Sequence, residues 1–535
     1  METSSIINRL EEANNNIVRQ ICEISGVPGM SVGVMYRGEV VYRHNLGVRN
    51  VKHPVPSTPK TIYCIGSLTK AFTAAAVANV FRDQIQTDWD TPVTDIIPGF
   101  KPSEKVLRGL ISTADFMSHR SGLFGDLSFA LQGNLEFLLP PEELIPTVNE
   151  LQKTKPFRQS WMYNNWGYSM AGCIVEKLSG KPFADYLHET ILKPLSLTHT
   201  TSKPRFDEDD NFADAHVALR DSRPYLLPRT FLFKDSIFES AGGIYSNVDD
   251  LLHWAKAILR AEKQPTKPLW QVPTLISNQI PLDNPSRDFR FYGMGWIRTQ
   301  LPGVVGLQGD NADILEKDEL PILGAGAQPM ITYYHQGSAP GYYSAIFLFP
   351  ESESAIVVLT NSMPLNDAAD WIAQTYISAL FDFPNPADYE GLARESCKRK
   401  VEKCDAVLSN MNKMRRDHAG DKPQPLAAYA GRYYNRPRNF LIEIRQHTED
   451  ASCLELRFQG KESQSYNLRY LYGNVFEWAM TFDEAAKKAR AANWDLEYFK
   501  LHFIFGEEQH AVSLTWAAFK VDRPEGILMQ WDNER

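Results

Sequence analysis

The spacing of apolar residues divides the chain into two parts. Over the first 385 residues, helical spacing alternates with short apolar runs at the spacing of strands. The predicted elements are a helix over 6–25, a hairpin over 30–42 that turns at Arg37-Gly38, a strand over 330–334, a hairpin of 343–349 and 355–360, and a helix over 366–381. Because two helices and two hairpins lie at opposite ends of this part, we expect one α/β domain closed by its termini.

From residue 426 onward, apolar residues recur at every second position. Strands are predicted over 429–434, 440–445, 453–458, 466–472, 498–505, 511–516 and 527–531, with a short helix near 483–492. Seven or eight short strands indicate a small antiparallel barrel or sandwich. Residues 386–425 are charged and helical, so the sequence predicts a domain over 1–385, a helical linker over 386–425 and a β domain over 426–535.

Composition and charge argue against several classes of partner. The chain has 535 residues, a formal net charge of −9 and a sequence pI near 5.8, which disfavours nucleic-acid binding. We expect no membrane partner, because the start of the chain lacks an apolar signal region and no apolar run is long enough to span a bilayer. The six cysteines lack metal-ligand spacing, and we interpret them as reduced thiols of a cytoplasmic protein without metal or organic cofactor.

The strongest candidate for chemistry is Ser67, which precedes a run of small and apolar residues over 71–81. The run predicts a buried helix, and Gly66 is the expected break before it. Ser67 and Lys70 would share one face of the first turn, with Cβ atoms ~5–6 Å apart. Burial favours neutral lysine, which makes Lys70 a candidate base for Ser67. The start of the helix also leaves N–H groups to hold an oxyanion.

Nearby residues offer alternatives to this pair. Ser57-Thr58-Pro59-Lys60 has the same spacing, but it contains a proline and lacks a helical run. Cys64 is either a rival nucleophile or a buried apolar side chain. His119 stands among polar residues, where a histidine is more often a structural hydrogen-bonding group than a catalytic one.

Two segments between the motifs have recognisable local signals. Ser246 is predicted to cap a helix whose first-turn acid is Asp249. The stretch over about 262–330 is rich in Pro, Gly and Asp, a composition typical of long loops and of lids over a site.

Three short motifs lie in order along the first part of the chain: Ser67-Leu68-Thr69-Lys70, Tyr163-Asn164-Asn165 and His335-Gln336-Gly337. In this order the chain resembles the serine β-lactamase and penicillin-binding-protein superfamily, especially its class C-type esterases, D-aminopeptidases and acyltransferases. Met117 to Leu123 resembles a further segment of that family, with Arg120 in place of the usual Thr. The resemblance implies an α/β (α+β) fold with an antiparallel sheet flanked by helices. The C-terminal part resembles the lipocalin-like domain of some members.

The resemblance also implies roles for the site residues. Ser67 would attack an acyl carbon, and Lys70 or Tyr163 would accept its proton. The charge of Lys70 is expected to favour the Tyr163 phenolate. Asn165 would orient Lys70 and hold a substrate amide. The oxyanion would lie between the backbone N–H groups of Ser67 and Ser338, which follows Gly337 of the third motif.

The third motif departs from the Lys-Thr-Gly of β-lactamases and peptidoglycan enzymes. A neutral His335 and the hydroxyl-free Gln336 favour an ester, thioester or amide substrate without a fixed carboxylate. This substrate would be a small molecule or a peptide, either free or attached to a carrier. The aromatic residues near the motifs line an acyl pocket or belong to the core: Tyr63, Trp161, Trp166, Tyr342 and Tyr343.

The sequence therefore predicts a serine hydrolase that forms an acyl-Ser67 intermediate. The alternatives are an acyltransferase or thioesterase-like cyclase that releases a natural product, and a binding protein with an inactive site. The intact Ser67, Lys70, Tyr163 and Asn165 argue against the inactive protein.

Overall fold

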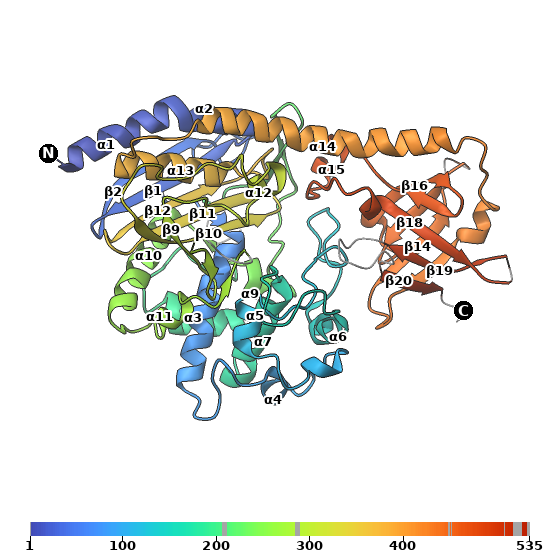
Figure 1. Ribbon diagram of the computed structural model, residues 1–535, viewed down its shortest axis with the longest axis horizontal. Helices are drawn as coiled ribbons and strands as arrows, with labels where there is room; N and C mark the ends of the chain where they lie inside the picture. Colours follow the sequence, from blue (N-terminus) through green and yellow to red (C-terminus); the bar gives the residue numbers. More distant parts are fainter. Residues whose placement is uncertain are drawn as a thin grey trace. The chain divides into compact units, whose positions relative to one another are not determined.

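The structure is a computed structural model, and it describes residues 2–205, 211–283, 289–447, 450, 452–507, 509–516 and 527–531. The chain forms two compact units: residues 1–125 with 151–399, and residues 126–150 with 400–535 (Figure 1). The charged segment after residue 385 forms helix α14 (Tyr389–Asp417). The sequence did not indicate that residues 126–150, which include helix α6 (Leu144–Glu150), belong with the C-terminal strands.

An antiparallel sheet of eight strands organises the first unit, in the order β2-β1-β12-β11-β10-β9-β8-β7. The strands are β1 (Gly29–Tyr36), β2 (Glu39–Gly47), β7 (Ile280–Pro281), β8 (Phe291–Tyr292), β9 (Ile297–Leu301), β10 (Met330–Ala339), β11 (Tyr342–Phe349) and β12 (Ser354–Thr360). Strand β1 pairs with β12, with Val32 opposite Val358. The first and last hairpins therefore meet in one sheet, as the apolar pattern predicted.

Helices cover both faces of this sheet (Figure 1). Helices α1 (Glu2–Ala13), α2 (Arg19–Ser25) and α13 (Ala368–Phe381) pack on one side, and α10 (Val248–Lys263) packs against β1 and β12. Every residue of β11 and β12 is buried, which agrees with their mostly apolar sequence. The predicted antiparallel sheet flanked by helices is confirmed.

Shorter elements surround the start of the motif helix α3 (Thr69–Arg82), which packs against α7 (Asn165–Ser179). The remaining helices of this unit are α4 (Val93–Ile96), α5 (Thr113–Met117), α8 (Phe183–Leu187), α9 (Glu239–Gly242), α11 (Val272–Leu275) and α12 (Asp310–Ile314). Two small sheets pair β3 (Tyr63–Cys64) with β6 (Tyr245–Ser246), and β4 (His216–Ala218) with β5 (Pro224–Leu226).

Three local predictions need correction. Asn247, not Ser246, caps α10: its side chain accepts a 2.9 Å hydrogen bond from the N–H of Asp250, whereas Ser246 pairs with Tyr63 in a small sheet. Strand β10 does not end before the third motif but continues through it to the Pro340-Gly341 turn. The stretch over 262–330 contains strands and helices besides loops, and its residues 284–288 lie outside the described part.

The second unit contains a closed antiparallel barrel, which confirms the barrel rather than the sandwich. Its strands are β13 (Gly431–Tyr434), β14 (Leu441–Gln446), β15 (Leu454–Phe458), β16 (Ser465–Tyr472), β17 (Val475–Glu477), β18 (Lys500–Phe505), β19 (Ala511–Trp516) and β20 (Ile527–Trp531), with helix α15 (Phe482–Lys487). The pattern missed β17, which has only three residues. Buried aromatic rings pack together here, with Phe458 5.2 Å from Trp516 and 5.4 Å from Trp478. The likeness to lipocalins stays a prediction.

Candidate active site

The structure brings the three sequence motifs together around Ser67. This residue lies in a short 3-10 turn (Gly66–Leu68) that leads into α3, and its side chain is partly exposed. The Nζ of Lys70 lies 3.0 Å from the Oγ of Ser67, and the hydroxyl of Tyr163 lies 2.7 Å from the same atom. A nucleophile is therefore held between an amine and a phenol, although Tyr163 follows it by 96 positions.

Lys70 is buried, and three oxygen atoms surround its amine nitrogen. Besides Ser67, its Nζ contacts the side-chain oxygen of Asn165 at 2.7 Å and the carbonyl oxygen of Ala241 at 2.8 Å. Burial lowers the pKa of Lys70 well below its usual value. A neutral amine has two N–H bonds, and both Asn165 and Ala241 present oxygens that can only accept. Lys70 Nζ is placed to donate to all three partners as an ammonium; in the neutral form its lone pair would point at Ser67, the one partner that can donate a proton.

Tyr163 is a proton donor in this arrangement. Its hydroxyl donates to the Oγ of Ser67, and its ring lies 4.9 Å from the Nζ of Lys70. Burial raises the pKa of Tyr163, and the hydrogen bond with Ser67 only partly offsets this effect. The expectation that Lys70 favours a Tyr163 phenolate is therefore wrong for this site. Desolvation of both groups favours the protonated phenol and the neutral amine.

The second motif is fixed at the start of α7. The side chain of Asn164 caps this helix by accepting from the N–H of Gly167 at 3.3 Å, and it donates to the carbonyl of Leu123 at 3.0 Å. Asn165 is the first residue of the helix, so its amide projects toward Lys70 from a rigid element. The geometry agrees with the orienting role expected for Asn165.

The third motif lies on β10, directly against the turn that carries Ser67. A Cβ atom on Gly66 would lie 2.9 Å from the backbone nitrogen of Ser338, and one on Gly337 would lie 2.2 Å from the carbonyl oxygen of Ile65. Both contacts are too close for a side chain, so glycine at each position lets the strand approach the turn. The approach places the backbone of Ser338 beside the residue that precedes the nucleophile.

His335 is neutral and is held by two polar partners. Its Nδ1 lies 2.5 Å from the carbonyl oxygen of Gln336, which can only accept, so the proton is on Nδ1. The other nitrogen then accepts from the hydroxyl of Tyr292 at 3.0 Å. Burial lowers the pKa of His335 to about 3. His335 therefore supplies no positive charge at neutral pH, as the sequence suggested.

The comparisons with known proteins agree with this geometry. A family model described as Beta-lactamase matches residues 14–378. The chain belongs to the beta-lactamase family.

Two relatives and one solved structure show the range of this family. An unguisins hydrolase from Aspergillus campestris is 25% identical over 365 residues, which cover 66% of this chain and 62% of that protein. A beta-lactamase from Yersinia enterocolitica is 24% identical over 385 residues, or 68% of this chain and 90% of that protein. The octameric penicillin-binding protein homologue from Pyrococcus abyssi has a TM-score of 0.56 and 21% identity, and it covers 97% of this chain and 99% of its own. This likeness shows the fold.

Within the beta-lactamase fold, the middle residue of the third motif serves the core. The side chain of Gln336 donates to buried Asp370 on α13 at 3.0 Å. Neighbouring residues on a strand point to opposite faces, so Gln336 faces α13 while His335 faces Tyr292. The side chain of Gln336 therefore ties β10 to α13.

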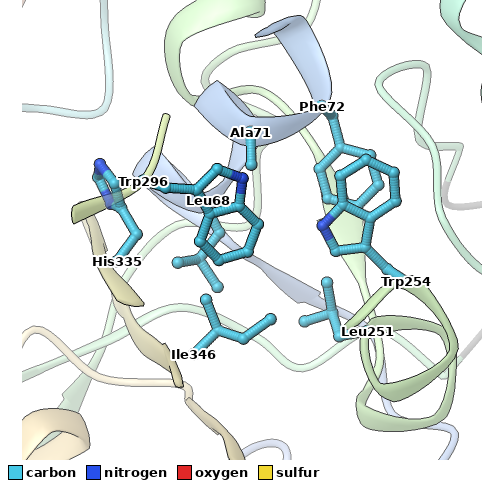
Figure 2. A pocket seen from close by; sticks show the side chains of 8 residues that line it. All are labelled: Leu68, Ala71, Phe72, Leu251, Trp254, Trp296, His335 and Ile346. Atoms are coloured by element: carbon cyan, nitrogen blue, oxygen red, sulfur yellow. The ribbon is translucent and has the colours of Figure 1, made fainter. Parts of the chain in front are cut away.

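An apolar layer closes the back of the site in this family member (Figure 2). It is formed by Leu68, Ala71, Phe72, Leu251, Trp254, Trp296, His335 and Ile346. Figure 2 shows the Phe72 ring lying over that of Trp254, and their centroids are 4.0 Å apart. The gap between these side chains is too narrow for a water molecule. The layer packs α3 against the sheet and keeps water away from the buried side of the helix.

Most of the aromatic residues near the motifs belong to the core. The hydroxyls of Tyr342 and Tyr343 bond to the Ala213 carbonyl and to Asp310 at 2.8 and 2.7 Å, and the buried ring of Trp166 packs on Phe238. Tyr63 is also buried. Trp161 differs, because it is partly exposed and its ring lies 6.1 Å from that of Tyr163. Trp161 is the one member of the set that is not buried.

Sequence reasoning missed two contributors to the site. Ala241 contributes only a carbonyl group, which has no sequence signal. Tyr292 lies in the stretch interpreted as loop, although the alternation over Ile297 to Leu301, the strand that pairs with it, is a strand signal. Cys64 is not a plausible nucleophile, because burial raises the pKa of its thiol to about 12.

All six cysteines are free. Within the described ranges, no group of three His, Cys, Asp or Glu side chains is arranged to hold a metal ion. Every helix in those ranges is too short or too polar to cross a membrane.

Proposed function

We propose that the protein is a serine hydrolase that cleaves a neutral ester, thioester or amide through an acyl-Ser67 intermediate. The observation that carries the proposal is the surrounding of buried Lys70, whose Nζ lies 3.0 Å from the Ser67 Oγ and 2.7 and 2.8 Å from two oxygens that can only accept. A base whose pKa is lowered toward neutrality is what proton abstraction from a serine hydroxyl requires.

The proposed reaction has two steps that use the same groups. In acylation, the Oγ of Ser67 forms a bond with the acyl carbon while Lys70 accepts the hydroxyl proton. The bond to the leaving alcohol, thiol or amine breaks, and Tyr163 gives that group a proton. In deacylation, water attacks the acyl carbon and gives a proton to the Tyr163 phenolate. The bond between the acyl carbon and the Oγ of Ser67 then breaks as Ser67 takes back its proton from Lys70, which returns both groups to their starting forms. The N–H groups of Ser67 and Ser338 would hold the oxyanion in both steps.

The substrate is proposed to lack a carboxylate beside the scissile bond. Neutral His335 occupies the position where relatives with Lys-Thr-Gly have a cation, and a buried anion without a partner would be costly. Relatives of this chain include an unguisins hydrolase as well as beta-lactamases, so the family alone does not set the substrate. Partly exposed Trp161 would contact an apolar acyl or leaving group.

Intact-mass spectrometry after treatment with a fluorophosphonate and with p-nitrophenyl esters tests this function. We expect one adduct on wild type, its loss in Ser67→Ala, and its retention in Ser57→Ala, which removes the other Ser-x-x-Lys serine. An adduct that persists in Ser67→Ala would contradict the assignment. No adduct on folded wild type would favour the inactive binding protein. Products that appear only when an alcohol or amine acceptor is added would favour the acyltransferase or the thioesterase-like cyclase.

A further inference from the structure

His119 holds the chain on both sides of Tyr163. Its carbonyl oxygen accepts from the N–H of Met162 at 2.9 Å, and its Nδ1 accepts from the N–H of Asn164 at 3.0 Å. Its ring centroid also lies 4.4 Å from that of Tyr163. One residue thus contacts Tyr163 and both of its neighbours, so a displacement of His119 would reach the phenol that faces Ser67.

The backbone of His119 explains how one residue makes both contacts. It follows α5 with a φ of 60°, in the left-handed region that residues other than glycine adopt uncommonly. Its own N–H bonds to the carbonyl of Phe116 at 3.2 Å, which fixes the turn. In this conformation the carbonyl and the imidazole both reach residues 162–164.

The imidazole of His119 is neutral in this position. Burial lowers the pKa of His119 well below its usual value. Because Nδ1 accepts the N–H of Asn164, the proton is on Nε2, which is buried without a hydrogen-bond partner among the described residues. A neutral ring adds no charge next to Lys70, so it holds Tyr163 without disturbing the amine.

We propose that His119 is a positioning residue, which holds the phenol of Tyr163 at Ser67 and acts on the reaction only through Tyr163. The proposal rests on the proposed function for its effect on rate. Its structural part rests on the two hydrogen bonds to the chain that flanks Tyr163. The hydrogen bonds of His119 go to backbone groups of described residues, so it is not assigned a catalytic role.

A double-mutant cycle on the acylation rate of Ser67 tests the proposal. His119→Ala is expected to slow acylation by about 10- to 100-fold, because a displacement of about 1 Å is enough for such losses. In the Tyr163→Phe background, the same change is expected to alter the rate less than about twofold, because the phenol it positions is absent. Equal losses in both backgrounds would overturn the proposal.

Two further variants separate positioning from general stability. His119→Asn keeps an acceptor near Nδ1 and tolerates the left-handed backbone, so it should restore the rate to within about threefold of wild type. His216→Ala removes another buried histidine, which contacts the Asn361 carbonyl at 3.0 Å, and should leave the rate unchanged when the protein is folded. Failure of His119→Asn to restore the rate in a folded protein would count against the hydrogen bond to Asn164.

Amide hydrogen exchange tests the structural part without any activity. Exchange in a peptide that spans residues 161–166 should become faster in His119→Ala and stay near wild type in His119→Asn and His216→Ala. If wild type is not acylated but this exchange pattern is found, the proposed function fails and the positioning contact stands. If exchange in His119→Ala equals that of wild type, the positioning contact fails, whatever the activity.

Discussion

Lys70 in the first unit and Arg490 in the second are both buried basic side chains without a carboxylate contact among the described residues. Lys70 is 0% exposed and Arg490 is 6% exposed. Arg490 donates to the side-chain oxygen of Gln132 at 2.8 Å and to the hydroxyl of Tyr498 at 3.1 Å, and its guanidinium lies 4.7 Å from the ring of Trp478.

The two side chains respond differently to burial because their chemistry differs. A guanidinium stays charged in a protein, so its burial requires acceptors and aromatic faces around the whole group. An amine can respond to burial by becoming neutral, and its pKa falls. Similar burial therefore produces a fixed structural charge at Arg490 and a candidate base at Lys70.

The largest expected effect tests whether Lys70 must lose its proton. Lys70→Arg keeps the charge but cannot supply a neutral base, and we expect Ser67 acylation to fall about 10³-fold or more. The rate of fluorophosphonate labelling, followed by intact mass, measures this effect. Arg490→Lys, the reverse exchange in the other unit, should leave the labelling rate unchanged if the protein is folded. Rapid labelling of Lys70→Arg would mean that position 70 contributes charge and not a base.

A smaller effect is expected when Arg490 loses an acceptor. Gln132→Ala leaves the guanidinium and the Tyr498 hydroxyl short of a partner, so the free energy of unfolding should fall by about 2–3 kcal/mol. Urea unfolding followed by tryptophan fluorescence measures the change. Adding Arg490→Met should recover part of the loss, since a buried charge is then removed. If the double mutant loses as much unfolding free energy as Gln132→Ala and Arg490→Met lose separately and added together, the unpartnered charge of Arg490 is not the cause of the loss in Gln132→Ala.

The smallest effect, taken per pH unit, is a dependence of stability on pH. Because the pKa of Lys70 is lowered in the folded protein, the unfolded chain binds more protons between that lowered value and the usual 10.5. The free energy of unfolding should therefore rise with pH in this window, by at most about 1.4 kcal/mol per pH unit. Lys70→Met should remove this component of the slope in urea titrations from pH 6 to 9.5. The same slope in wild type and Lys70→Met would indicate that Lys70 keeps its usual pKa.

The chemical identity of the site could be predicted from local sequence. Gly66, Ser67 and Lys70 lie within one turn of a strongly apolar helix, and helical spacing alone places the amine beside the hydroxyl. The hairpins of the large sheet and most strands of the barrel were also predictable. A strand buried on one face has apolar residues at every second position, and a strand buried on both faces has a continuous apolar run. The three-residue strand β17 was missed because three residues are too few to show an alternation of apolar and polar positions.

Only the tertiary structure decided which form each group takes. The carbonyl of Ala241 approaches Lys70 across 171 positions, and Gln132 reaches Arg490 across 358 positions. These contacts and the burial around them favour a neutral Lys70 and a protonated Tyr163. The sequence determined which groups are available and which elements carry them. Desolvation and long-range hydrogen bonds depend on the assembled fold, and they alone decide which group is charged and which can act as a base.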